Sequence, residues 1–173
     1  MKQILFSAAI FLMSLSSNSS SAQGTSDKSI IIPDVAAVEA LTASNEAKAT
    51  EVNVRAMRDF SRSYKNAPDA KWFKSDKGYF ASFDENGTNT KIAYDSKGRR
   101  SYSIISYTAS KLDRKIRSLV MSTYFESTII GVHQFEFENK TVYVVKMQDP
   151  NSNPLTLKVC DEQIEDITSH AKK

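Results

Sequence analysis

The side chains that most often bind metals or transfer protons are few in this sequence. His133 and His170 are the only histidines among 173 residues, and Cys160 is the only cysteine. A structural zinc ion takes four closely spaced ligands, so this set nearly excludes a zinc site. His133 alternates with Phe135 and Phe137, which places it on one face of a strand among aromatic rings. We expect a packed histidine. The alternative is the polar group of a pocket near His133 in a small-molecule-binding protein or an enzyme.

The carboxylates do not form an acid–base pair. Glu136 and Glu138 point the same way on a strand, opposite to His133, which is consistent with solvent contact rather than with the apolar pocket that raises a carboxyl pKa. The chain has no Gly-x-Ser-x-Gly turn and no phosphate-binding glycine loop. We therefore expect no catalytic residue and no cofactor.

Asp84–Asn89 resembles a calcium-binding loop but lacks the bidentate glutamate at the twelfth position, where the shorter Asp95 stands. Asn86-Gly87 within it is typical of a hairpin turn. We expect a turn there and no metal site. Cys160 lies in a strand-like run, Leu155–Cys160, where a lone cysteine is usually a small buried apolar residue. A reactive thiol or an intermolecular disulfide is the alternative.

The N-terminus has the pattern of an export signal. A basic start precedes twelve uncharged residues, Ile4–Leu15, and Ser20 and Ala22 supply the small residues for signal peptidase. The apolar run is shorter than the roughly 20 residues that span a bilayer. We expect cleavage near Ala22-Gln23, a periplasmic or secreted protein, and no membrane insertion after cleavage; a retained anchor is the alternative.

Charge gives no argument for a nucleic-acid partner, and we expect none. The formal net charge is +3, and removing residues 1–22 leaves +2. Basic residues gather in two groups, which we interpret as a solvated helix face, with an anion-binding patch as the alternative: Lys97, Arg99 and Arg100, and then Lys111, Arg114, Lys115 and Arg117.

Beyond the signal, the pattern predicts an arm and one domain. Residues 23–50 read as a linker or flexible arm, in which Asp34 could cap a short helix. A helical stripe follows over 51–64. Ser110, with Asp113 three residues on, has the capping-box pattern for a second helix running to Tyr124. Residues 169–173 form a tail. Strand-like runs bounded by turn signals are predicted at 70–75, 78–83, 90–94, 100–107, 129–138, 141–148, 155–160 and 163–168.

The two halves of the domain, about 51–107 and 108–168, look like one unit used twice. Tyr64 corresponds to Tyr124, and Tyr79 to Tyr143. Each unit is a helix followed by antiparallel strands. We therefore expect an α+β fold in which two tandem units share one continuous antiparallel sheet, with the helices packed on one face.

These residues resemble the PepSY-like family, also called β-lactamase-inhibitor-like, of mostly uncharacterised exported proteins. The resemblance covers about Glu51–Thr168. The segments that carry it are the helix ending near Tyr64, Ala70-Lys71-Trp72, Gly78–Phe83, the Tyr94–Gly98 turn, Leu112–Tyr124, Ile130-Gly131-Val132 and Tyr143–Met147. The chain departs from the pattern at Ala109-Ser110, where relatives tend to carry Leu-Pro, and at Cys160, which replaces an aromatic residue.

The resemblance implies a fold in which helices back a concave sheet that grips its partner. It does not imply inhibition of β-lactamase, because fold does not carry function. We expect a non-enzymatic binding module for an envelope or extracellular protein or peptide, and a protease or hydrolase inhibitor is one form of it. An open sheet face that gathers Trp72, Tyr79, Tyr94 and Tyr102 would be the expected binding surface.

Overall fold

The computed structural model describes residues 31–44, 51–67 and 69–168. The expected signal peptide with its cleavage site, the arm residues 23–30 and 45–50, and the tail 169–173 with His170 lie outside the described residues. All the helices and strands discussed below lie after Ile31, in one compact unit. Within the described part of the chain, no helix is both long and apolar enough to cross a membrane.

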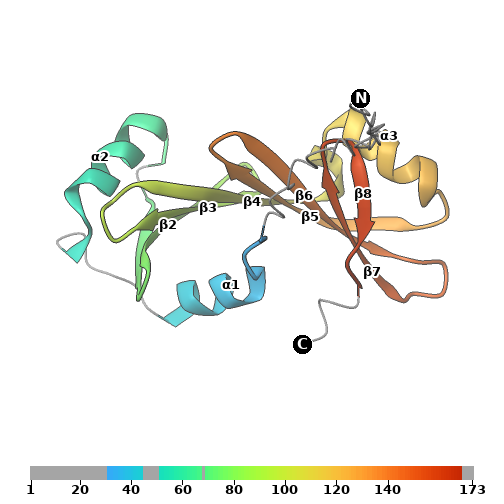
Figure 1. The fold of residues 1–173 in the computed structure, drawn as a ribbon, viewed down its shortest axis with the longest axis horizontal. Coiled ribbons are helices and arrows are strands. Elements are labelled where there is room, and N and C mark those ends of the chain that lie inside the picture. The colour runs from blue at the N-terminus through green and yellow to red at the C-terminus, as the bar shows by residue number, and fades with distance from the viewer. Residues whose placement is uncertain (1–30, 45–50, 68, 169–173) are drawn as a thin grey trace, which may run out of the picture. The chain divides into compact units, whose positions relative to one another are not determined.

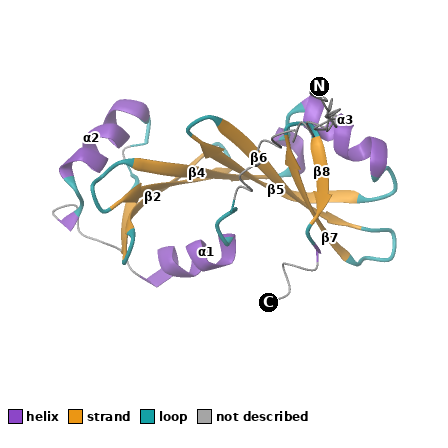
Figure 2. Cartoon of the chain, viewed as in Figure 1, coloured by secondary structure: helices purple, strands orange, loops and turns teal. Residues whose placement is uncertain are grey.

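Helices and strands occur in two successive sets (Figures 1 and 2). The helices are α1 (Val35–Ser44), α2 (Val54–Ser63) and α3 (Arg114–Thr123), with a short 3₁₀ turn, η2 (Ala109–Lys111), before α3. The strands are β1 (Lys71–Ser75), β2 (Gly78–Glu85), β3 (Thr88–Asp95), β4 (Arg100–Tyr107), β5 (Thr128–Phe137), β6 (Lys140–Gln148), β7 (Pro154–Cys160) and β8 (Gln163–Asp166). Each predicted strand is present, with ends shifted by a few residues.

The eight strands form one antiparallel sheet in chain order, which confirms the predicted fold class. Tight turns explain this order, since a two-residue connection returns the chain beside the strand it has just left. Asn86 and Gly87 join β2 to β3 with φ angles of 50° and 70°, the conformation predicted for this pair. The edge strands β1 and β8 are the shortest, which limits their pairing with other chains.

Helices α2 and α3 begin at side-chain caps. Asn53 accepts a hydrogen bond from the Arg55 N–H at the start of α2. Asp113 accepts from the N–H groups of Lys115 and Ile116 at the start of α3. The prediction that Ser110 caps this second helix is wrong, because Ala109–Lys111 form the 3₁₀ turn and the carboxylate of Asp113 takes the capping role.

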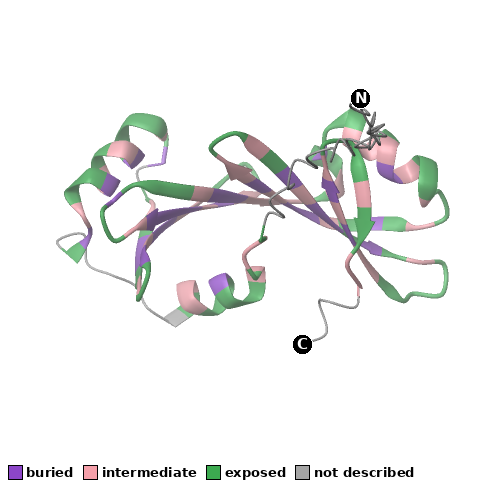
Figure 3. Cartoon of the chain, in the orientation of Figure 1, coloured by how far each residue is buried: buried purple, intermediate pink, exposed green. Residues whose placement is uncertain are grey.

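Strand register places α2 and α3 on the same face of the sheet. Residues opposite each other in neighbouring strands share a face, as do residues two apart in one strand. Ile92, in the core under α2, lies opposite Ser103. Ser103 shares its face with Tyr107, which lies opposite Val132 in the core under α3. We call this side of the sheet the helix face; the central parts of its strands are buried (Figure 3).

The opposite side, which we call the α1 face, carries α1. The predicted cap is present, since Asp34 Oδ1 accepts from the Ala36 N–H at 3.0 Å. Val38 is the buried residue of this helix. Between the helix and the sheet lies a cavity of about 610 Å³, which we call the α1 groove, with Ala37, Val38 and Leu41 on one side and Phe80, Ala93 and Tyr102 on the other.

The two sets have the same order, a helix followed by four strands. Tyr64 and Tyr124 both end their helices, with similar backbone angles of −125°, 66° and −118°, 46°, and each donates its backbone N–H to the residue four positions earlier. The sequence-based pairing of these tyrosines therefore matches their structural positions. A duplication in the history of the chain stays a prediction.

Candidate functional site: the cleft at the junction of the two halves

Three of the four aromatic residues predicted to form a binding surface lie under α2. Trp72 and Tyr94 have 8% and 3% of their surface exposed, and their ring centroids are 5.7 Å apart. Tyr79 packs against the same core. Their apolar area stabilises the contact between α2 and the sheet, because burial of apolar surface contributes about 25 cal/mol per Å².

Tyr102, the fourth residue, lies on the α1 face. Its ring contacts those of Phe80 and Phe137, at centroid distances of 6.4 and 6.1 Å. The four rings therefore do not share one open face, which corrects the expectation. The reason is that α2 covers the side of the sheet to which Trp72, Tyr79 and Tyr94 point. Partner binding by these residues stays a prediction.

His133 is packed on the α1 face, as its alternation with phenylalanines predicts. It is 8% exposed, and its Nδ1 lies 2.8 Å from the hydroxyl oxygen of Ser106. Burial lowers the pKa of His133 to about 4, and the charge of Lys146 adds to this effect. The imidazole is therefore neutral at pH 7. Neither the α1 groove nor the cleft described next is lined by His133.

The other residues considered for chemistry are isolated. Cys160 is a free thiol at the end of β7, half-buried, and burial raises its pKa. Asp84 accepts a hydrogen bond from Asn89 across the hairpin turn. No group of three or more His, Cys, Asp or Glu side chains that could hold a metal ion occurs among the described residues.

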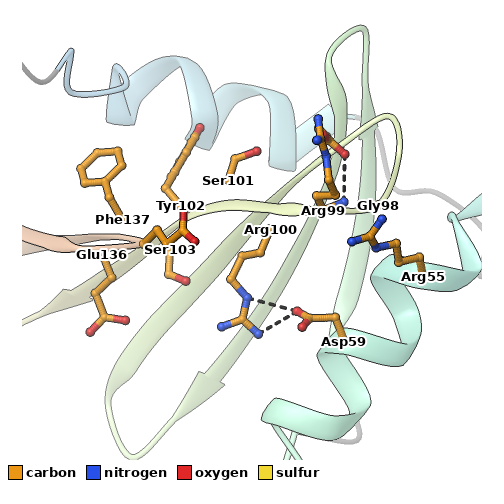
Figure 4. Close-up of a pocket in the computed structure, with 12 residues that line it drawn as sticks. Arg55, Asp59, Gly98, Arg99, Arg100, Ser101, Tyr102, Ser103, Glu136 and Phe137 are labelled. Carbon is orange, nitrogen blue, oxygen red and sulfur yellow. Dashed lines mark hydrogen bonds and ion pairs between the residues drawn. The ribbon is translucent and has the colours of Figure 1, made fainter.

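A cleft of about 700 Å³ lies at the junction of the two halves, where β4 meets β5 (Figure 4). We call it the junction cleft. Its lining comes from α2, from the β3–β4 turn, from the start of β4 and from the end of β5: Arg55, Asp59, Asp95, Gly98, Arg99, Arg100, Ser101, Tyr102, Ser103, Glu136, Phe137 and Glu138. Its volume falls in the ~300–1,000 Å³ range of ligand-binding pockets.

Two ion pairs line the cleft. Arg100 donates through Nε and Nη2 to Asp59 Oδ2, at 3.1 and 2.7 Å, and also to Ser63. Arg99 pairs with Asp95 at 2.7 Å, and hydrogen bonds led by that from the Arg99 N–H lower the pKa of Asp95. The basic group at 97–100 does not lie on the expected helix face, because Lys97 and Arg99 are in a turn and Arg100 begins β4. Its two arginines are neutralised by these pairs.

Other charges on the walls are unpaired. Among the described residues, the exposed guanidinium of Arg55 and the exposed carboxylate of Glu138 make no ion pair. Glu136 accepts a hydrogen bond from the side chain of Gln134 at 2.9 Å. Figure 4 shows Arg55 beside Gly98, at the end of the cleft remote from Glu136. The cleft is therefore positive at the α2 end and negative at the β5 end.

The ladder between β4 and β5 ends inside the cleft. Pairing between β4 and β5 runs only from Ser103–Glu136 to Tyr107–Val132. Of the first three residues of β4, Arg100 and Tyr102 pair with β3, and the ring of Tyr102 contacts that of Phe137, the last residue of β5. Asp95, Ser101 and Tyr102 line both the junction cleft and the α1 groove. The start of β4 is thus bordered by a cavity on each face of the sheet.

Sequence reasoning did not find this site. Arg55 and Asp59 lie four residues apart on α2, where the sequence pattern indicates only an apolar stripe. The opposite orientation of Glu136 and His133 was predicted and is confirmed by the register. The position of Glu136 beside Arg100–Ser103 depends on pairing between strands 33 residues apart, which local pattern does not reveal.

Comparison with known proteins shows the fold. No family model matches the sequence, and no curated protein does. Several solved structures are similar. A DUF2874 family protein from Bacteroides ovatus has a TM-score of 0.56 and 17% identity, over 67% of this chain and 88% of that one. A candidate periplasmic protein from Bacteroides eggerthii has a TM-score of 0.55 and 13% identity, over 68% and 91%.

A BLIP-like protein from Bacteroides fragilis, with a TM-score of 0.55 and 17% identity, matches over 68% of this chain and 87% of that one. The chain therefore has a BLIP-like fold, as its resemblance to a β-lactamase-inhibitor-like family implied. Membership of the PepSY-like family itself stays a prediction. At these identities the likeness concerns architecture alone.

Proposed function

We propose that this chain is a non-enzymatic binding module, exported to the periplasm or beyond, that holds a protein or peptide partner in the junction cleft. The observation that carries the proposal is the pair of unpaired, opposite charges on the walls of an open cleft, Arg55 at one end and Glu138 at the other. Ionised groups in a cleft steer and orient a partner of complementary charge.

The comparisons support the setting of this proposal. The similar structures include a candidate periplasmic protein and a BLIP-like protein, which fits the expected export signal of residues 1–22. Inhibition of a protease or hydrolase would be one form of such binding. The alternative of a pocket near His133 has no comparable support, because that imidazole is packed and bonded to Ser106.

The test is capture of envelope proteins by the exported protein, purified from cells that express the full chain. Arg55→Glu and Glu138→Lys reverse the two unpaired charges. Arg114→Glu and Glu126→Lys are the matched controls, since both residues are exposed and lie outside the cleft. We expect a protein that the parent and both controls retain and both cleft variants lose. Equal capture by all five proteins, or by none, would refute the proposal.

A further inference from the structure

The α1 groove is the more apolar of the two cavities. Val38 and Leu41 line it from the helix, and Phe80 and Ala93 line it from the sheet. Its volume of about 610 Å³ lies within the ~300–1,000 Å³ range of small-molecule sites, which are mostly apolar with a few polar groups. The groove is therefore large enough, and apolar enough, for a small organic ligand.

The space under α1 exists because the side chains of this helix are small. Its sequence, VAAVEALTAS, is rich in alanine. Val38 is buried, whereas Ala37 lines the groove and is exposed. A ligand between α1 and the sheet would remove apolar surface of both from water, which favours binding.

One polar group of the groove has no partner. Tyr102 is half-buried, and Figure 4 shows its side chain extending towards α1. Its ring packs against Phe80 and Phe137, and no described residue forms a hydrogen bond with its hydroxyl. Burial raises the pKa of Tyr102, so the hydroxyl is protonated at pH 7. Partly buried polar groups usually have a hydrogen-bond partner, and a ligand could supply it.

The charges that line the groove are mainly negative. Asp34 and Asp76 are exposed, and neither makes an ion pair with a described residue. Asp95 also lines the groove, but it is paired with Arg99. Lys77 supplies one positive charge, which the two carboxylates outside ion pairs outweigh. This potential favours a cation over an anion.

We propose that the α1 groove binds a small organic cation, in which an ammonium group is carried on an apolar chain or ring. The apolar part would fill the space between α1 and the side chains of Phe80 and Ala93. The ammonium group would lie at the acidic rim, and the hydroxyl oxygen of Tyr102 would serve as a neutral acceptor, since a tyrosine hydroxyl accepts as well as donates. This site is separate from the binding of a protein or peptide in the junction cleft.

The direct probe is a set of three compounds with one apolar body and different charges: phenylbutylamine, phenylbutanol and phenylbutyrate. Binding to the isotope-labelled exported protein is measured at pH 7 by titration of its amide NMR signals. We expect millimolar or tighter binding of the amine, at least about fivefold tighter than that of the carboxylate, with the alcohol between them. The shifts should fall on α1 and on β2–β4. Equal affinities, no binding, or shifts confined to other parts of the chain would overturn the inference.

The acidic rim is tested by Asp76→Lys. The matched control is Glu85→Lys, which makes the same change of charge at the other end of β2, at an exposed residue outside both cavities. The preference for the amine over the carboxylate should fall at least about threefold in Asp76→Lys and should persist in the control. An unchanged preference in Asp76→Lys would overturn the inference.

The space under α1 is tested by Ala37→Trp, because a large side chain at this position would occupy the groove. Ala36→Trp is the matched control, since Ala36 is equally an exposed alanine of α1 but does not line the groove. We expect Ala37→Trp to weaken binding of the amine at least about tenfold and Ala36→Trp to leave it within about twofold. The amide signals of β5–β8 report whether each variant is folded. Equal affinities of the two folded variants would overturn the inference.

Discussion

Tyr94 on β3 donates its hydroxyl proton to Asp59 on α2, across 3.0 Å. Burial, with the bond to Asp59 adding to it, raises the pKa of Tyr94 well above its usual range, so the hydroxyl stays a donor. Arg100 on β4 donates to the same carboxylate oxygen and lies over the ring of Tyr64 at 5.3 Å. One carboxylate thus joins α2 to two neighbouring strands.

We expect Tyr94→Phe to lower the free energy of unfolding by about 1 kcal/mol, the usual contribution of one hydrogen bond. Asp59→Ala should cost about 1–2 kcal/mol, because it also leaves the half-buried Arg100 without its partner. Urea denaturation measures both. Tyr124→Phe is the control, since the described residues provide its hydroxyl with no hydrogen bond. A loss as large in Tyr124→Phe would contradict this account.

Gly98→Ala should destabilise the protein by about 1–3 kcal/mol. Gly98 has a φ of +73°, and an added Cβ would lie 2.6 Å from Asn53 Oδ1 and 2.9 Å from the Ala56 nitrogen. Gly131→Ala is the matched control, because a Cβ there meets nothing within 4 Å. It should change the free energy of unfolding by less than about 0.5 kcal/mol. Thermal denaturation of the two variants tests this prediction. Similar melting temperatures for the two variants would contradict the close contact of a Cβ at position 98 with Asn53 and Ala56.

Acid should weaken the fold through His133. Its pKa is lowered to about 4 in the folded protein, against an ordinary value of 6.5. Above pH 6.5 the imidazole is neutral in both states, and its contribution to stability is complete. Between pH 6.5 and 4 the unfolded chain binds a proton that the folded chain does not, so the free energy of unfolding falls, by about 1–3 kcal/mol.

The comparison is His133→Gln, which keeps a polar group near Ser106 and does not titrate. Urea midpoints at pH 7 and pH 4.5 should differ less in this variant than in the parent, since the carboxylates titrate in both proteins. If the free energy of unfolding falls equally in the two proteins on acidification, protonation of His133 does not cause the loss of stability.

Cys160 should react slowly with iodoacetamide. Burial, followed by the neighbouring Asp161 charge, raises the pKa of the thiol, and the thiolate is the reactive form. Mass spectrometry at pH 7.5 should show alkylation at least about threefold slower in the folded protein than in urea. Free cysteine, measured in both solutions, corrects for the effect of urea on the reagent. Equal corrected rates would show that the thiol is activated or fully accessible.

The sequence predicted the sheet better than the site, for physical reasons. Strand pattern and turn chemistry are local, so runs such as 78–83 and the Asn86-Gly87 turn identify their elements directly. The face that a helix covers is not local. Trp72 and Tyr102 look alike in sequence, yet α2 covers the first, and the second lies on the α1 face.

The site depends on the least local feature of the fold. Ser103 and Glu136 are brought together only by the pairing of β4 with β5, and that ladder ends inside the cleft. The register shift between Ala93 and Tyr94 also displaces Arg100 relative to β3. Neither the ladder's end nor the shift has a signal in the spacing of nearby residues.

The order of the strands has a consequence for how the chain can fold during its synthesis. Because every strand pairs with its predecessor in the chain, α2 and β1–β4 need nothing from the C-terminal half to complete their own hydrogen-bonded ladders. A polypeptide emerging N-terminus first can assemble this sheet one strand at a time, and low contact order favours rapid folding. The junction between the halves would then form once β1–β4 have paired, when β5 pairs with β4 and before β6–β8 are added.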